Sequence, residues 1–325
     1  MKLLVSMGIR TDKRHDANPS SKCDKAALKL IDWDSGRELE SLEYKTPQEF
    51  YPGSDNMQFK AGSVYGDHFI VVTDTEVLFL NVNHFRVDKR ITISSFNDLH
   101  YATVHNDSLY VVNTGLDIIQ IIDSNGNIIE EVNTSYDPTW KRFDRTVDYR
   151  KVESTKPHNT HPNYVFFLPD GSRWITRFNQ KDAICVDDPA KSIDLNVSEG
   201  RPHDGKVIGD SIYFTITDGY IVVASAITLK KEDIISLADL DNRKSIRNMG
   251  MGWCRGIHVD AKRAYVGFSR FRGSRSQEYV RWIMHVGNPM NSRIAEYDLI
   301  EKKLVKEIGF AGCKSAAIYS INSVD

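Results

Sequence analysis

The stretch that decides the fold is GRPHDGKVIGDSIYFTITD, residues 200–218. It reads as a strand from His203, a tight polar turn at Gly209 and Asp210, and an alternating strand through Tyr213 and Thr215. One such hairpin is common in proteins. Its value here is that the chain repeats it.

Five copies of the hairpin, and a sixth first strand that has no second strand, can be aligned on one apolar residue in the first strand. These anchor residues are Val64, Val104, Val165, Val207, Val259 and Ile318. The spacing is about 40 to 55 residues, and each unit has room for four short strands, which is typical of β-propeller blades. A blade cannot bury both faces alone, so it packs on its neighbours around an axis.

The position four residues before each anchor is always basic or imidazole. These six residues are Lys60, His100, His161, His203, Arg255 and Lys314. In a propeller they begin the inner strands, at the mouth of the central channel. The sequence therefore predicts that six nitrogen-bearing side chains, far apart in the chain, meet around one pore.

The two ends of the chain are predicted to share a blade. Strands at residues 1–8, 26–34 and 38–44 have no inner strand, whereas the segment from Lys314 is an inner strand without companions. Together they make the last blade and remove open edges. We therefore expect an all-β, six-bladed β-propeller that forms a single domain over residues 1–325.

Four insertions interrupt the blades, at residues 9–25, 133–159, 229–244 and 271–292. The segment 229–240 has apolar residues spaced by three and four and is expected to be helical. The other three should lie on the same face as the channel mouth. Long insertions in a compact domain often build sites, so this face is the expected functional one.

Composition excludes some classes of function. The formal net charge is −2 with 42 basic and 44 acidic residues, so nothing indicates a nucleic-acid partner. No stretch is apolar enough to span a membrane or serve as a signal peptide. The four cysteines have no CxxC spacing, and thiols in a cytoplasmic protein fit best. The oligomeric state is left open.

At the level of the fold, this repeat pattern resembles the six-bladed propellers of the NHL, SMP-30 and strictosidine-synthase type. The resemblance rests on blade number and strand pattern along the whole chain. Members that bind calcium carry acidic residues and Asn around the mouth. Here the matching positions hold Lys, His and Arg, so a calcium site is not expected.

Three imidazoles on consecutive blades, His100, His161 and His203, are candidate ligands for a divalent metal ion. Three His would leave positions open for water or substrate, as in catalytic zinc, manganese or iron(II) sites. The alternative is a polar channel mouth filled with ordered water, in which the imidazoles satisfy backbone groups.

The cations Lys60, Arg255 and Lys314 occupy the other half of the circle. Clustered positive charge needs a negative partner, either acidic side chains from the loops or an anionic ligand, and we expect a ligand. Arg177 and Arg270 follow second strands and are further candidates for binding it.

Three other residues are candidates for proton transfer. His158 lies in PHNTH (157–161), Asp204 follows His203, and Tyr101 follows His100. Each has a simpler alternative: turn capping for His158, a backbone contact for Asp204 and core packing for Tyr101.

These residues together predict a metal-dependent lyase, epimerase or hydrolase acting on a small anionic molecule or acidic sugar. The alternative is a propeller module without catalytic activity that binds an anionic ligand or an acidic protein partner. Neither the substrate nor the metal can be named from the sequence.

Overall fold

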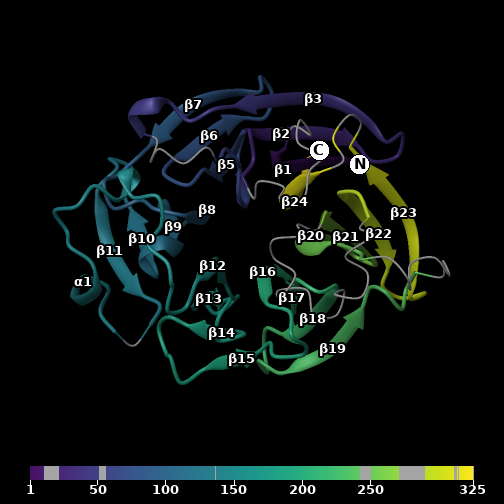
Figure 1. Cartoon of the computed structure of the whole chain (residues 1–325). Coiled ribbons are helices and arrows are strands. Elements are labelled where there is room, and N and C mark those ends of the chain that lie inside the picture. Colours follow the sequence, from purple (N-terminus) through teal and green to yellow (C-terminus); the bar gives the residue numbers. More distant parts are fainter. Residues whose placement is uncertain are drawn as a thin grey trace.

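The computed structural model describes residues 1–10, 22–50, 56–135, 137–241, 250–270, 290–310, 313 and 315–324. These residues form six four-stranded antiparallel sheets arranged as blades around a central channel (Figure 1). The expected all-β propeller with six blades is therefore confirmed. Each inner strand contacts the inner strands of both neighbouring blades, so the ring is closed.

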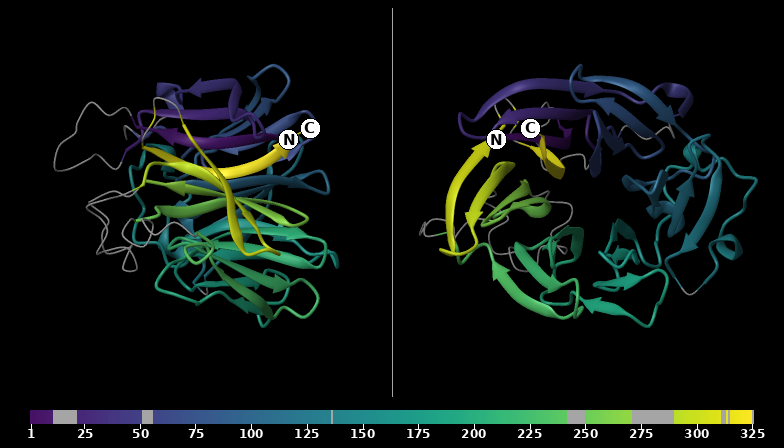
Figure 2. Two further views of the ribbon diagram at one scale, coloured as in Figure 1. Left: turned by 90° about the vertical axis from the view of Figure 1, so that its right-hand side faces the viewer. Right: turned by 180° about the vertical axis from the view of Figure 1, so that it is seen from behind.

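The first blade takes strands from both ends of the chain, as expected, in the order β24-β1-β2-β3. Its strands are β24 (Ala316–Val324), β1 (Lys2–Ile9), β2 (Lys25–Asp32) and β3 (Arg37–Tyr44). Residues Lys2 and Val324 are paired in the ladder between β1 and β24, and the two ends of the chain lie side by side in both views of the ring (Figure 2).

The other five blades each use four consecutive strands. In chain order these are β4 (Gly62–Tyr65), β5 (His68–Val72), β6 (Val77–Asn81) and β7 (Arg86–Ile91); β8 (Leu99–His105), β9 (Ser108–Asn113), β10 (Ile118–Ile122) and β11 (Ile128–Asn133); β12 (Pro162–Phe167), β13 (Arg173–Arg177), β14 (Asp182–Cys185) and β15 (Ser192–Asp194); β16 (Pro202–Ile208), β17 (Ser211–Ile216), β18 (Tyr220–Ser225) and β19 (Lys231–Ser236); and β20 (Trp253–Asp260), β21 (Arg263–Ser269), β22 (Arg293–Asp298) and β23 (Lys303–Gly309).

Helical structure in the described residues is confined to short turns. These are α1 (Thr139–Arg142) and the 3-10 turns η1 (Gln48–Phe50), η2 (Thr114–Leu116) and η3 (Tyr149–Lys151). Two of them, α1 and η3, belong to the expected insertion at 133–159. No helix in these parts of the chain is long and apolar enough to cross a membrane.

The expected helix at 229–240 is wrong. This segment contains β19, the outer strand of its blade, in which Ile235 pairs with Ile221 of β18. The apolar spacing suggested a helix because β19 is an edge strand with few buried side chains. Its sequence therefore lacks the regular alternation of apolar and polar residues that indicates a strand. The sequence also predicts a strand at 245–249 as the fourth strand of the His203 unit, but these residues lie outside the described part of the chain.

Apolar side chains fill the space between neighbouring blades. One cluster joins Leu3, Val5 and Met7 of β1 to Tyr265 and Ile294 of the adjacent blade. Burial of these faces makes each blade depend on its neighbours. The polar inner ends of the strands are thereby held around the channel.

Candidate functional site

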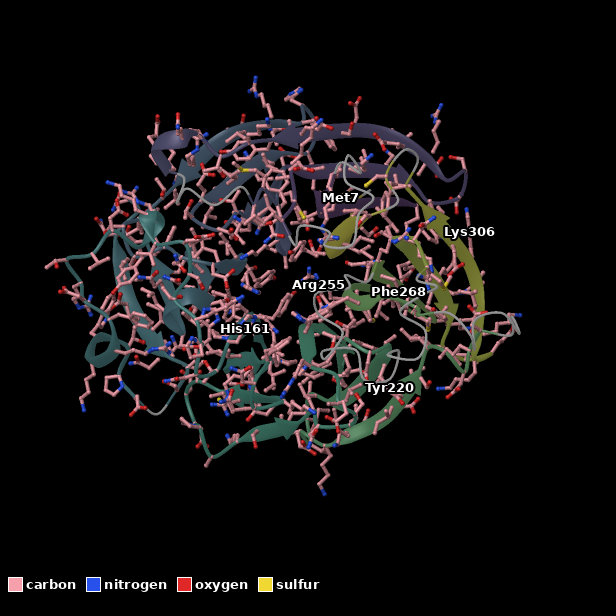
Figure 3. All side chains as sticks on the ribbon, viewed as in Figure 1. Met7, His161, Tyr220, Arg255, Phe268 and Lys306 are labelled. Carbon is pink, nitrogen blue, oxygen red and sulfur yellow. The ribbon has the colours of Figure 1, made fainter. Side chains whose placement is uncertain are left out.

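A cavity of about 810 Å³ opens at one end of the channel. It is lined by residues of every blade and of the 133–159 insertion: Lys22, Asn56, Gln58, Lys60, Asp74, Asn97, Asp98, His100, Val152, Glu153, Ser154, Thr155, Lys156, Pro157, His158, His161, Phe178, Asn179, His203, Trp253, Arg255 and Tyr319. Figure 3 shows His161 and Arg255 near the centre of the ring. Five of the six residues expected at the mouth therefore share one cavity; the sixth, Lys314, lies outside the described residues.

Local irregularities at the start of the inner strands direct these side chains toward the channel. The pairing of β8 with β9 shifts register at His100, that of β16 with β17 shifts just after His203, and that of β20 with β21 shifts around Arg255. Such bulges turn side chains out of the regular alternation. Gly256 has φ +75°, and a Cβ there would lie 3.1 Å from the backbone of the next inner strand, so glycine is required.

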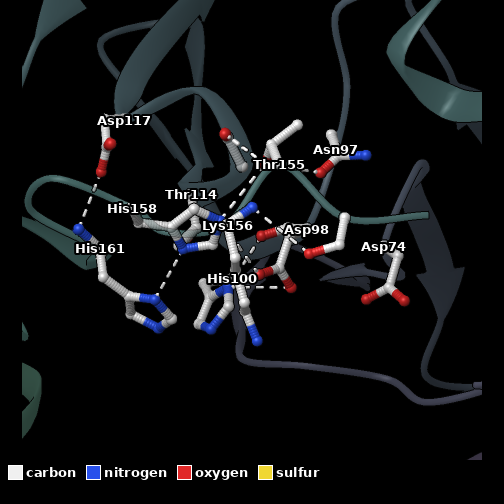
Figure 4. Close-up of polar contacts among 12 residues, drawn as sticks. Asp74, Asn97, Asp98, His100, Thr114, Asp117, Thr155, Lys156, His158 and His161 are labelled. Atoms are coloured by element: carbon white, nitrogen blue, oxygen red, sulfur yellow. Dashed lines mark hydrogen bonds and ion pairs between the residues drawn. The ribbon is translucent and has the colours of Figure 1, made fainter. Parts of the chain in front are cut away.

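Three imidazoles form one group on one wall of the cavity (Figure 4). The ring centroids of His100 and His161 are 4.8 Å apart in an edge-to-face arrangement. His158 also contacts His161, with 2.9 Å between their Nδ1 atoms. The Nδ1 atom of His100 lies 2.8 Å from the backbone oxygen of Asp98.

A buried carboxylate shapes the loop that carries two of these imidazoles. Asp117 accepts hydrogen bonds from the backbone N–H groups of Asn159, Thr160 and His161 at 2.7, 3.0 and 2.8 Å. His161 itself has φ 51°, a left-handed conformation that is unusual for a residue with a side chain. Asp117 thus holds a strained backbone that presents His161 to the cavity.

The ammonium of Lys60 is buried between two carboxylates. Its Nζ atom lies 2.7 Å from Asp74 and also pairs with Asp98. Burial disfavours the charged ammonium, but the negative charges of Asp74 and Asp98 outweigh burial and raise the pKa of Lys60. Acidic side chains therefore neutralise this member of the ring.

The imidazoles of the cavity are neutral near pH 7. Burial is the largest cause in each case: it lowers the pKa of His161 to about 3 and, with the positive charge of Lys60, holds the pKa of His100 well below its usual value. The pKa of His158 is also lowered by burial. A neutral imidazole has one nitrogen lone pair with which it can accept a proton.

The opposite wall offers positive charge and aromatic surface. The guanidinium of Arg255 lies 3.5 Å from the ring centre of Tyr319, and its Nε donates to the backbone oxygen of Ile318 at 2.9 Å. No carboxylate of the described residues pairs with it. Nearby, His203 is 7% exposed and its Nε2 atom has no hydrogen-bond partner in this part of the chain. This wall thus holds a guanidinium without a carboxylate partner and a buried imidazole nitrogen without a hydrogen-bond partner among the described residues.

Four of the predicted site residues do not reach this cavity. Arg177 is buried in a two-pronged ion pair with Asp182, and Arg270 donates to Asn291. Asp204 does not line the cavity and accepts hydrogen bonds from Thr215 at 2.5 Å and from the backbone of Gly256 at 3.0 Å.

Tyr101, the fourth, stacks on Tyr164 with 3.9 Å between ring centres and lines a separate cavity of about 150 Å³. Packing, the simpler alternative for Tyr101, describes its contacts. The backbone contact of Asp204 is to Gly256 of the next blade and not to its own turn. His158 is different, because it lines the large cavity and contacts His161.

The structure does not bring the three expected imidazoles, His100, His161 and His203, together as one group. Phe178 packs against both His161 and His203, with 4.8 and 5.4 Å between ring centres. In the described residues, no group of three His, Cys, Asp or Glu side chains is placed to hold one metal ion. His100 and His161 are in contact, whereas His203 belongs to the wall of Arg255.

Several residues of the site were missed by sequence reasoning. Asp98 precedes His100 by two residues, Asp74 comes from the preceding blade, and Thr155 comes from the insertion. A signal existed for Asp98, since acidic side chains from the loops were the alternative to the anionic ligand that we expected beside the cations. Nothing in the local sequence indicated Thr155 or Asp117, whose contacts depend on the folding of the insertion.

Comparisons with known proteins support the fold. No protein-family model matches the chain, and no curated protein is significantly similar to it. A crystal structure of a protein of unknown function from Bacteroides caccae is similar over 98% of this chain and 97% of its own, with a TM-score of 0.59 and 10% identity. A chain of a nidogen/laminin complex matches over 99% and 97%, with a TM-score of 0.54 and 8% identity. These matches show the propeller fold alone.

Proposed function

We propose that this chain is an enzyme of the lyase, epimerase or hydrolase kind that acts on a small anionic molecule, such as a sugar acid, at the channel mouth. The observation that carries the proposal is the pairing of two walls in one cavity. One wall holds Arg255 and His203, whose polar groups are available to a ligand. The other holds His100 and His161, which are neutral bases.

The anionic group of the substrate would bind on the wall of Arg255. A guanidinium makes two parallel hydrogen bonds to a carboxylate, and its stacking on Tyr319 fixes its plane. The aromatic rings of Phe178 and Trp253 are nearly parallel, at an interplanar angle of 8°, and give the cavity apolar surface for the carbon skeleton of a sugar.

Proton transfer would occur on the wall of His100 and His161. A C–H bond next to a bound carboxylate becomes more acidic when positive charge stabilises the enolate that forms. A neutral imidazole takes that proton. Delivery of a proton from a second donor to the opposite face gives epimerisation. Transfer of the proton from the imidazolium to a neighbouring hydroxyl, which leaves as water, gives elimination.

A divalent zinc, manganese or iron ion belongs to the proposal in a limited form. It would be held by His100 and His161, which lie in contact, and would supply positive charge next to a substrate oxygen. A nitrogen that binds the metal has no lone pair left for a proton, so the metal and direct proton transfer to these imidazoles are alternatives. The proton-transfer steps above need only the side chains of the protein.

The test is deuterium exchange in D₂O. The protein is incubated with a panel of sugar acids and with the matching neutral sugars, and proton NMR follows the C–H group beside the carboxylate. We expect exchange for at least one acid, for none of the neutral sugars, and at least 100-fold slower exchange in His161→Gln. The matched control is His68→Gln, a partly exposed imidazole on β5 that pairs with Asp88.

Tight binding of an acid without exchange or product would contradict the enzyme proposal. That result would favour the second candidate, a propeller module that binds an anion without chemistry. The same observation of Arg255 supports that candidate, because a guanidinium without a carboxylate partner in the described residues needs only an anion.

We also infer that the chain is a distant member of the NHL, SMP-30 and strictosidine-synthase group. The support is the number of blades and the closure of one blade by both ends of the chain. Intermediate sequences that link this chain to that group would strengthen the assignment, whereas links to propellers with another blade number would overturn it.

A further inference from the structure

The hydrogen bonds on one wall of the cavity, beginning at Thr155, determine which nitrogen of each imidazole carries the proton. The Oγ1 atom of Thr155 lies 2.6 Å from the backbone oxygen of Gly115 and 3.2 Å from Oδ1 of Asn97. The amide nitrogen of Asn97 donates to the backbone oxygens of Tyr149 and Val152, so its Oδ1 atom is an acceptor. Both of these oxygen atoms are acceptors, so the single hydroxyl proton of Thr155 is donated to them.

The next contact is therefore fixed in direction. Thr155 has no second proton, so its Oγ1 atom can only accept from Nε2 of His158, which lies 3.3 Å away. Asp98, whose Oδ2 atom is 4.0 Å from the same nitrogen, favours a proton there as well. His158 thus carries its proton on Nε2 and has a lone pair on Nδ1.

That lone pair determines the tautomer of His161. The two Nδ1 atoms are 2.9 Å apart, and a hydrogen bond between them needs one proton. Because Nδ1 of His158 accepts, Nδ1 of His161 donates. A neutral imidazole has one N–H group, so the lone pair of His161 is on Nε2.

His100 reaches the same state by a separate route. Its Nδ1 atom faces the backbone oxygen of Asp98, which only accepts, so the proton is on Nδ1 and the lone pair on Nε2. Two rings with 4.8 Å between their centres therefore both carry Nε2 lone pairs.

We propose that Thr155 and His158 are positioning residues, which fix the tautomer of His161 so that it and His100 form a site of two acceptor nitrogens. This inference deepens the proposed function and rests on it for its chemical meaning, although the order of protons can be measured without any substrate. A site of two acceptor nitrogens binds a group that gives a proton or a positive charge.

The inference also narrows the class of ligand. A molecule that satisfies both walls carries a carboxylate or similar anion for Arg255 and a hydroxyl or acidic C–H group for the paired nitrogens. A hydroxy acid has both groups, whereas a simple carboxylate or a neutral sugar has one.

The experiment is a long-range proton–nitrogen NMR correlation on protein labelled with ¹⁵N-histidine, which separates the two neutral tautomers of each ring. The chain has 10 His, and single His→Gln variants assign the three signals. We expect the Nδ1–H tautomer for His100 and His161 and the Nε2–H tautomer for His158.

Two variants test the role of the hydroxyl. In Thr155→Val the acceptor for His158 is lost, so we expect mixed tautomers at both His158 and His161, with His100 unchanged. Thr155→Ser keeps the hydroxyl and should restore the wild-type pattern. Thr146→Val, at an exposed threonine of the same insertion, is the matched control.

An Nε2–H tautomer on His161 in the wild-type protein would overturn the inference, and this result does not depend on whether a variant folds. A folded Thr155→Val protein with unchanged tautomers would also overturn it. If the tautomers are as expected but no acid exchanges deuterium, the proposed function is wrong and the assignment of the three tautomers is confirmed.

Discussion

Replacement of Lys60 by Met should destabilise the protein through the two carboxylates that it leaves behind. The Lys60 side chain is 2% exposed, and those of Asp74 and Asp98 are 20% and 26% exposed. Loss of one partner from a buried ion pair costs about 3 to 5 kcal/mol. Because both carboxylates keep some contact with water, we expect the lower end, about 3 kcal/mol at pH 7.

The effect should depend on pH in a defined direction. In the folded protein burial opposes ionisation of Asp98, but Lys60 and then the nearby imidazoles outweigh it, so the pKa of Asp98 is far below its usual value. A lowered pKa contributes stability above the unfolded value of about 3.9, and this contribution is lost as the pH falls through the folded pKa. The variant lacks that contribution, so the difference between the two proteins should shrink below about pH 4.

The assay is urea unfolding of both proteins between pH 7 and pH 3.5, followed by circular dichroism. Lys25→Met is the control, because its partner Glu43 is 56% exposed and such pairs contribute about 0 to 1 kcal/mol. In Lys60→Met/Asp98→Asn the uncompensated charge is reduced, so part of the stability should return. A loss below 1 kcal/mol, or one that is the same at every pH, would refute the reasoning.

Three further predictions concern the ligand wall, the metal and the closure of the ring. Arg255→Met should weaken binding of a hydroxy acid about 10-fold to 100-fold, because a charge-assisted hydrogen bond contributes about 1.5 to 3 kcal/mol. Calorimetry measures the affinity, and the stability of the protein should change little. Equal affinity of the variant and the wild-type protein would show that the anion binds elsewhere. In a zinc or manganese titration, His100→Ala and His161→Ala should each abolish uptake while His203→Ala retains it; loss in all three variants would restore the three-imidazole site. Removal of residues 316–325 should abolish the cooperative unfolding transition, since one blade loses its inner strand; an unchanged transition would show that the ring does not need this strand.

The fold could be predicted from the sequence because its signal is repeated. A single hairpin such as 200–218 is common, but five copies and a sixth inner strand in one register specify blade number, inner strands and the position of the mouth. The outer strand β19 was missed for the opposite reason. It buries little, so packing places few demands on its residues, and its apolar spacing allowed a helix.

The candidate site could be predicted only where it depends on the repeat. The ring positions of His161 and Arg255 follow from the blade register. Their partners do not, because Asp98, Asp117 and Thr155 come from irregular loops whose path depends on the whole fold. For Arg177 the blade register was not enough. Its side chain was expected to bind a ligand at the mouth, but the carboxylate of Asp182 holds it inside the blade.

The pairing of Lys2 with Val324 has a mechanical consequence. In this antiparallel pair both chain ends are at the same end of the ladder, so force applied between them would unzip β1 from β24 one hydrogen bond at a time. A ladder loaded lengthwise would share that force among all its bonds. The seam that completes the ring is therefore its weakest line under tension, and a single-molecule pulling experiment should open this blade first, at low force.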